Sequence, residues 1–183
     1  MTRLSVNVNK YALLRNSRGK NLPDVVRIAR DCERFGAEGV TVHPRQDERH
    51  IRYAAVEPLK AVVATEFNIE GYPDERFMEM VLRVRPDQCT LVPDASNQLT
   101  SDHGWDTVRE GEFLKRTIEK LKEKGIRVSL FLNPEPEMVL GAKNVGADRI
   151  ELYTGVFAEE FAEDAEKAVA PHVAASRAAA ELG

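Results

Sequence analysis

The hydrophobic positions of this chain form short apolar segments that alternate with longer segments of helical spacing. Short segments rich in Val, Ile and Leu predict buried strands, and apolar positions spaced by three and four predict amphipathic helices. Strands are predicted at residues 4–8, 39–43, 66–70, 88–92, 127–132 and 148–153. Helices are predicted at residues 24–35, 51–64, 73–81, 110–124, 135–145 and 158–182. Residues 13–19 are predicted to form a basic turn. Pro58 and Pro171 are expected to break or kink their helices.

A weak repeat connects several of these segments. At Gly36, Gly125 and Gly146 a predicted helix ends, a glycine turns the chain, and an apolar strand begins within a few residues. This layout is typical of the junction between successive βα units. The sequence therefore predicts about six such units, with no hairpin signature between them.

Two α/β architectures accommodate repeated βα units: an open doubly wound sheet and a (β/α)8 barrel. The chain has neither a GxGxxG turn nor a GxxxxGK[ST] loop, which removes support from nucleotide-binding open sheets. Polar residues instead fall at the carboxyl ends of the strands, where barrel enzymes carry their chemistry. These residues are Asn7, Asn9, His43, Asn68, Glu70, Asn133 and Glu151. We therefore expect one incomplete TIM-type barrel domain over residues 1–183, since a full barrel takes about 250 residues.

Composition and charge narrow the classes of function. The chain is 43% hydrophobic and 31% charged, with a net charge of −4 and no run of Lys or Arg, so nothing indicates a nucleic-acid partner. No signal-peptide core or membrane-length apolar run is present. Cys32 and Cys89 form neither a metal-binding nor a disulfide pattern. These features predict a cytoplasmic protein whose anion site, if it has one, is local.

The segment at residues 39–50 carries the densest candidate chemistry. An apolar strand breaks at Pro44, and His43, Arg45, Arg49 and His50 follow within eight positions. A titratable base and several cations at the end of a parallel strand are typical of a phosphate-handling site, although an ordinary charged loop is the alternative. A metal pair of His43 and His50 is disfavoured because the arginines between them would repel a cation.

Several motifs resemble those of the pyridoxine 5′-phosphate synthase family and run the whole length of the chain. They are Asn7-Val8-Asn9, Leu14-Arg15-Asn16-Ser17-Arg18-Gly19, Gly39-Val40-Thr41-Val42-His43-Pro44-Arg45, Arg49-His50-Ile51, Asn68-Ile69-Glu70, Leu91-Val92-Pro93, Val128-Ser129-Leu130-Phe131 and Ile150-Glu151-Leu152-Tyr153-Thr154-Gly155. The resemblance implies a (β/α)8 barrel assembled as a homo-octamer. It also implies condensation of 1-deoxy-D-xylulose 5-phosphate with 3-amino-2-oxopropyl phosphate to pyridoxine 5′-phosphate, phosphate and water, without a metal or organic cofactor.

The resemblance also assigns roles to residues. His43 and Glu70 match catalytic residues, and Glu151 matches a glutamate that stabilises charged intermediates. Substrate contacts are implied for two groups of residues: Arg45, His50 and Thr100 toward the deoxyxylulose phosphate, and Asn7 and Arg18 toward the aminoketone phosphate. Asn9 and Lys10 stand where the family usually has Asp-His, beside the deoxyxylulose phosphate.

The family continues beyond this helix with a seventh strand that carries an Asn-Ala-Gly-His motif and a second catalytic histidine. We therefore expect this chain to be a C-terminally truncated copy that gives no product by itself. Two alternatives stay open: an inactive or phosphate-binding barrel fragment, and another phosphosugar-handling barrel enzyme such as an aldolase or epimerase. The second alternative needs a strand-end lysine or a metal cluster, and neither is convincing in the sequence.

Overall fold

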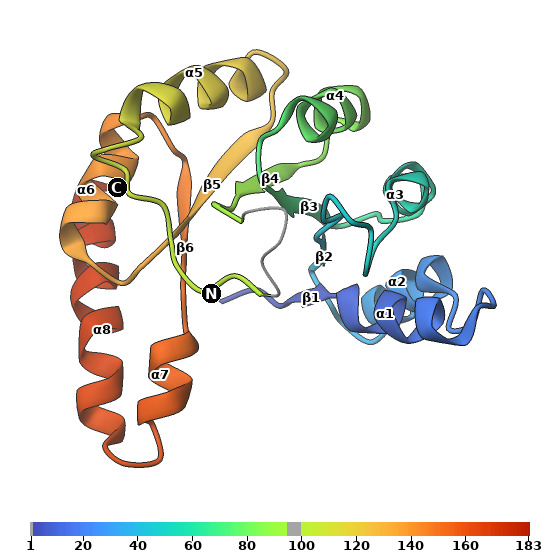
Figure 1. Ribbon diagram of the computed structural model, residues 1–183, viewed down its shortest axis with the longest axis horizontal. Helices are drawn as coiled ribbons and strands as arrows, with labels where there is room; N and C mark the ends of the chain where they lie inside the picture. The colour runs from blue at the N-terminus through green and yellow to red at the C-terminus, as the bar shows by residue number, and fades with distance from the viewer. Residues whose placement is uncertain (1, 95–99) are drawn as a thin grey trace. The chain divides into compact units, whose positions relative to one another are not determined.

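The computed structural model describes residues 2–94 and 100–183, and the chain divides into two compact units within strand β4 (Gln88–Leu91). The first unit covers Met1–Cys89 and the second Thr90–Gly183. Each unit consists of parallel strands and the helices that connect them (Figure 1).

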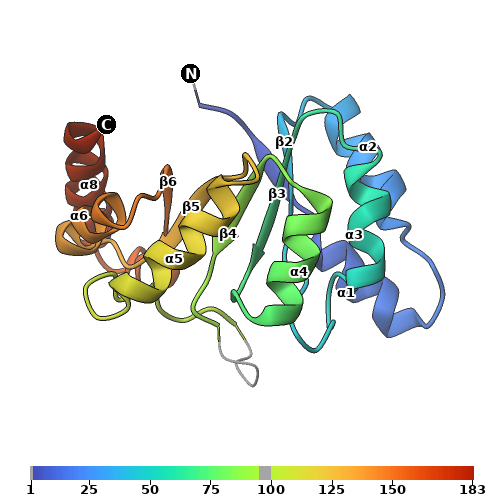
Figure 2. The ribbon, with the colours of Figure 1, turned by 90° about the horizontal axis from the view of Figure 1, so that it is seen from above.

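The first unit contains three complete strands and four helices. They are β1 (Ser5–Asn7), α1 (Asn9–Arg18), α2 (Val25–Arg34), β2 (Gly39–Val42), α3 (Tyr53–Lys60), β3 (Glu66–Gly71) and α4 (Glu75–Val84). The strands pair in parallel, with Ser5 opposite Gly39 and Gly39 opposite Glu66. Helices α2, α3 and α4 follow one another along one face of these strands (Figure 2).

The order of the strands in this unit identifies the class of fold. Strand β2 lies between β1 and β3, and the start of β4 continues beside β3, where the Asp87 N–H donates to the Phe67 carbonyl at 3.1 Å. In the common doubly wound order the fourth strand lies beside the first instead. Parallel strands that follow chain order are those of a TIM-type barrel. The predicted α/β fold, with six βα units of a barrel, is confirmed.

The second unit continues the same alternation of strand and helix. Its elements after β4 are α5 (Gly111–Lys122), β5 (Arg127–Leu132), α6 (Pro136–Asn144), β6 (Arg149–Leu152), α7 (Gly155–Glu160) and α8 (Ala165–Leu182). Strands β5 and β6 are parallel, with Ser129 opposite Arg149. Helix α8 packs along α6 and α7.

One carboxylate arrangement occurs in both units. Asp87 accepts hydrogen bonds from the Phe67 N–H and Lys60 Nζ, both at 2.9 Å. In the second unit Asp148 accepts from the Val128 N–H at 2.9 Å and from Lys122 Nζ at 2.7 Å. In each case the residue before a strand accepts from an N–H of the preceding strand and pairs with the lysine that ends the helix before that preceding strand. The βα repeat predicted from glycines therefore has a polar counterpart.

The core of the first unit explains the apolar, β-branched sequence of β2. Every residue of β2 is buried, and Val40, Val42, Phe67 and Ile69 are fully inaccessible. Parallel strands covered on both faces lose the alternation of apolar and polar residues that marks a half-exposed strand.

Three local predictions were wrong. Residues 9–18 form helix α1 rather than a strand end and a basic turn, because its buried positions are Ala12 and Arg15 while Leu13 and Leu14 are exposed. The apolar pattern therefore pointed away from a helix. Helix α8 runs through Pro171 without ending, since the loss of one N–H is offset where α8 packs on α6 and α7. Residues 155–160 also form a separate helix.

The expected end of α3 near Pro58 is present, because the helix stops at Lys60 rather than continuing to residue 64. Among the described residues, no helix has the length and apolar content needed to cross a membrane.

Candidate active site

The candidate active site of the first unit lies at the carboxyl ends of its parallel strands. Asn7 ends β1, His43 directly follows β2, and Glu70 is the penultimate residue of β3. Because neighbouring parallel strands end at the same edge of a sheet, these three side chains come together from distant parts of the sequence.

His43 and Glu70 form the centre of this cluster. His43 Nδ1 lies 3.8 Å from Glu70 Oε2, and both side chains are largely buried, with 8% and 12% exposed. Asn7 Nδ2 donates to the same Glu70 oxygen at 3.4 Å. The separation of 3.8 Å is longer than a hydrogen bond. A small shift of either side chain, or a substrate atom between the two, would allow a proton to pass between His43 and Glu70.

Asn9 fixes the backbone that carries the histidine. Its side-chain oxygen Oδ1 accepts from the His43 N–H at 2.8 Å, and its own N–H donates to Asn7 Oδ1 at 2.9 Å. This chain of hydrogen bonds ties the end of β1 to the end of β2. The sequence predicted Asn9 only as a substrate contact, and the structure adds this positioning role.

The surroundings of His43 keep its imidazole neutral. Burial, followed by the positive charges of Arg45, His50 and Arg49, lowers the pKa of His43 to about 3. A neutral imidazole beside a carboxylate is not an ion pair despite the short distance between them. At neutral pH the imidazole of His43 is therefore unprotonated at one nitrogen, so it can act as a general base but not as a general acid.

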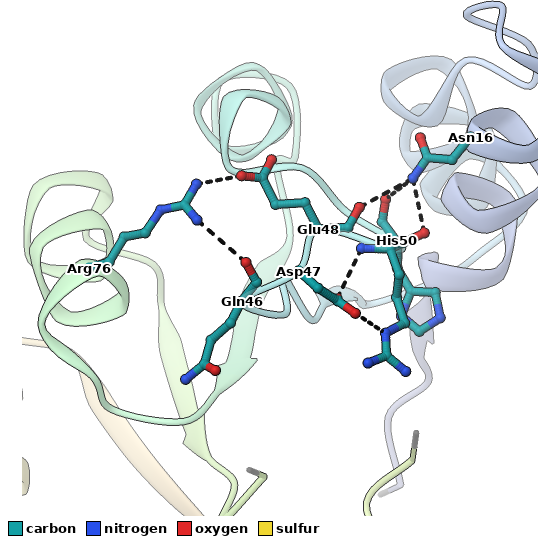
Figure 3. Close-up of polar contacts among 7 residues, drawn as sticks. Asn16, Gln46, Asp47, Glu48, His50 and Arg76 are labelled. Carbon is teal, nitrogen blue, oxygen red and sulfur yellow. Dashed lines mark hydrogen bonds and ion pairs between the residues drawn. The ribbon is translucent and has the colours of Figure 1, made fainter. Parts of the chain in front are cut away.

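The segment that carries these cations is held by helix α1. Asn16 Nδ2 donates to the carbonyls of Glu48, Arg49 and His50 at 3.4, 3.0 and 2.8 Å (Figure 3). Arg15 Nη2 reaches the His50 carbonyl at 3.5 Å as well. Two adjacent residues of α1 thus satisfy three successive carbonyls of a loop that has no partner strand.

The other side of this segment is held by helix α4. Glu48 lies in the left-handed region with φ of 54°, and its carboxylate pairs with Arg76 while also accepting from the Tyr53 N–H at 3.2 Å. Arg76 Nη1 donates to the Gln46 carbonyl at 3.4 Å (Figure 3). Between them, α1 and α4 fix the path of residues 46–50.

The predicted phosphate contacts differ in their exposure. Arg45 is 9% exposed, and the Nδ1 atom of His50 is buried with no hydrogen-bond partner in the described part of the chain. Lys10, in the first turn of α1, is exposed, and its charge contributes to lowering the pKa of His50 after burial and Arg45. Arg18 is exposed in the last turn of the same helix. The cluster is therefore cationic around a neutral base, which suits a dianionic phosphate.

Thr100 and Glu151 belong to the second unit and stay predictions as site residues. Thr100 is exposed beside the undescribed residues 95–99. Glu151 lies in β6, and burial raises the pKa of its carboxyl group.

Sequence reasoning missed the functions of Arg15 and Asn16. Both lie inside the motif at residues 14–19, but only Arg18 received a role there. The signal that could have identified them is two adjacent polar residues on the buried side of a segment whose leucines are exposed. Buried polar side chains of this kind usually form hydrogen bonds with other parts of the protein.

Comparison with known proteins gives consistent results. Residues 4–183 match the family described as "Pyridoxal phosphate biosynthesis protein PdxJ". Proteins named pyridoxine 5′-phosphate synthase from Flavobacterium johnsoniae, Cytophaga hutchinsonii and Bacteroides thetaiotaomicron are 52%, 54% and 54% identical to the chain over all 183 residues. The chain spans 77% of the length of each. In fold, the chain is similar to a mandelate oxidase variant with a TM-score of 0.67, at 14% identity over 98% of this chain and 59% of that one.

Proposed function

Since this chain belongs to the PdxJ family of pyridoxal phosphate biosynthesis proteins, its reaction is that of a pyridoxine 5′-phosphate synthase. We propose that His43 and Glu70 carry the proton transfers of that reaction, although we expect no finished product from these 183 residues alone. The reaction condenses 1-deoxy-D-xylulose 5-phosphate with 3-amino-2-oxopropyl phosphate and releases phosphate and water. The observation that carries the proposal is the buried contact between a neutral imidazole and a carboxylate at the ends of β2 and β3.

The chemistry requires a base beside a carbon acid. Once the amine of one substrate forms an imine with the ketone of the other, a neighbouring C–H becomes acidic and must lose its proton. Neutral His43 takes this proton, and Glu70, held by Asn7, is placed to relay it during the later losses of phosphate and water. A positioned base of this kind contributes about 10²–10⁴-fold to a rate.

Phosphate binding and base strength are linked in this arrangement. We place the phosphate of the deoxyxylulose substrate against Arg45, His50 and Lys10, with Asn9 beside them. Two of these groups, Arg45 and His50, lower the pKa of His43, so a bound dianion offsets their field and raises that pKa toward neutrality. The base therefore becomes stronger when its substrate is present.

The second substrate is assigned to the other residues of the cluster. Asn7 and Arg18 contact 3-amino-2-oxopropyl phosphate in this proposal, from the end of β1 and the end of α1. Thr100 is assigned to the deoxyxylulose phosphate. Glu151, whose carboxyl pKa is raised by burial, is assigned to the stabilisation of charged intermediates.

The proposal is tested on one step rather than on the complete reaction. In D2O, with both substrates present, ¹H NMR follows loss of the aminoketone methylene signal above the rate without protein. We expect His43→Asn to bring this exchange to background and Glu70→Gln to slow it about 10²-fold. Arg30→Gln, an exposed change on α2, serves as the control that keeps the rate. Unchanged exchange in His43→Asn would remove His43 from the mechanism.

We further propose self-association, as a homo-octamer, and a cytoplasmic location. Large apolar side chains of α1, α2 and their flanks are exposed in the first unit, namely Tyr11, Leu13, Leu14, Leu22 and Phe35. Such a surface supports a contact with a second copy. Cys32 and Cys89 are free thiols, which is typical of a reducing compartment. Analytical ultracentrifugation tests the assembly, and a monomer at micromolar concentration would contradict it.

A further inference from the structure

A second group of positive side chains lines a depression between the end of α1 and the start of α3. Arg15, Lys20 and Arg52 supply its charge, and Ala54 and Ala55 contribute apolar surface. The cavity measures about 350 Å³, at the lower end of the range of roughly 300–1,000 Å³ for small-molecule sites. None of these five residues belongs to the group assigned to the synthase reaction.

The three cations have no carboxylate partner within residues 2–94 and 100–183 as described. Other cations of the first unit do pair: Arg49 with Asp47 at 2.6 Å, Lys60 with Asp87 at 2.9 Å. Asp24 is the carboxylate whose charge acts on Arg15, but its Oδ1 already accepts from the Val26 N–H, at 3.0 Å, and caps helix α2. Asp24 therefore offsets part of the charge of Arg15, while Lys20 and Arg52 form no ion pair with a described residue, so the depression keeps a net positive charge.

Arg15 presents a fixed donor to this space. The residue is 7% exposed, and its Nε and Nη2 atoms donate to Asn16 Oδ1 at 3.2 and 3.1 Å. Its Nη1 atom donates no hydrogen bond within the described part of the chain. Burial, and then the like charge of Arg52, lower the pKa of Arg15. A bound anion would therefore stabilise the charged guanidinium in this position. A planar donor held in place in this way suits a tetrahedral oxyanion.

The start of α3 adds a smaller contribution. Arg52 is the N-cap of this helix, its side chain makes no capping hydrogen bond, and the first turn faces the depression through Ala54 and Ala55. The positive end of the helix dipole therefore points toward the space between the cations. Glu48 opposes this in part, because its carboxylate accepts from the Tyr53 N–H.

We propose that this depression binds a phosphate group, free or carried by a small molecule, as a site separate from the one around His43. Three cations against one small space favour a dianion over a monoanionic carboxylate. The absence of any Lys or Arg run in the sequence argues against a nucleic acid as the source. The inference stands on the cavity and its cations and does not depend on the proposed reaction.

Amide NMR tests the site with local reporters. The ¹⁵N-labelled chain is titrated at constant ionic strength with inorganic phosphate and, separately, with glycerol 3-phosphate. We expect saturable shifts of the Gly19, Ala54 and Ala55 amides, and we expect them to persist in an Arg45→Gln background that weakens the other site. Shifts with the ester alone identify a small-molecule ligand, and shifts with both identify recognition of the phosphate itself.

Charge variants complete the test. Lys20→Gln and Arg52→Gln change exposed side chains, and each is expected to weaken binding at these amides roughly threefold to tenfold. Arg30→Gln, an exposed change elsewhere on α2, is the matched control and keeps the affinity. Absence of saturable shifts, or equal affinity in Lys20→Gln, Arg52→Gln and the control, would overturn the proposal, and neither result would bear on the roles of His43 and Glu70.

Discussion

The link between cation charge and base strength predicts that Arg45→Gln raises the pKa of His43. Burial is the largest cause of the low value of about 3, and Arg45 is the largest of the three charges that lower it further. At the effective dielectric constant of about 20 that suits protein interiors, one nearby unit charge contributes on the order of 1–2 kcal/mol, or about one pKa unit. Because Arg45 is itself 9% exposed, little solvent screens this interaction. We therefore expect the pKa of His43 to be about 4 in the variant, since burial still lowers it.

The assay is a pH titration of the imidazole Cε1–H signals of histidine-labelled protein. In the wild type the His43 signal should stay in its neutral position down to the lowest pH at which the chain remains folded. In Arg45→Gln the His43 signal should start to titrate at a pH about one unit higher than in the wild type, and in Arg30→Gln it should match the wild type. A phosphate-bearing substrate should shift the wild-type signal in the same direction as the variant. An ordinary pKa near 6.5 in the wild type, or no rise in Arg45→Gln, would refute the reasoning.

Three further predictions concern the framework of the site and the second unit. Asn16→Ala should lower the free energy of unfolding in urea by about 1–2 kcal/mol, because three loop carbonyls lose their shared donor, and Asn16→Asp, which cannot donate, should lower it more. Gly104→Ala should cost about 2–3 kcal/mol, because its Cβ would lie 2.2 Å from the Asn133 backbone nitrogen, whereas Gly111→Ala should change stability by less than about 0.5 kcal/mol. Equal costs would contradict the close packing at Gly104. Glu151→Gln should become more stable than the wild type as the pH rises from the carboxyl pKa of the unfolded chain through the raised pKa of the folded chain. The reason is that only the wild type then carries a buried negative charge at this position. A stability difference in thermal melts that stays constant between about pH 4 and 8 would refute this.

The proximity of His43 and Glu70 could be predicted from the sequence because the ends of their strands are marked. The apolar run into His43 ends at Pro44, and the alternating segment of residues 66–70 ends at Gly71, so both residues could be placed at the carboxyl ends of parallel strands. Parallel pairing then brings them together whatever the helices between them do. The resemblance added their roles, and the structure supplies the distance of 3.8 Å.

Helix α1 could not be predicted by the same reasoning. Periodicity locates a helix when its apolar face is buried, but the buried positions of α1 include a charged residue, Arg15, and two adjacent leucines of α1 are exposed. The hydrogen bonds of Asn16 depend on three backbone carbonyls more than thirty residues away. No local pattern encodes such a contact, because its partners are carbonyl groups that every residue carries.

The hydrogen bonds of α1 connect the two anion-binding regions that we propose. Arg15 donates through Nη2 to the His50 carbonyl, and the same residue lines the depression beside Arg52. Asn16 holds the same carbonyl more tightly, at 2.8 Å, so the backbone of His50 is fixed from one side while its imidazole Nδ1 is left for the substrate phosphate. A ligand that draws Arg15 toward the depression therefore acts on a donor of the segment that sets the pKa of His43. We therefore expect the two separate regions to be coupled through this shared guanidinium, while Asn16, which does not line the depression, limits how far the segment can move.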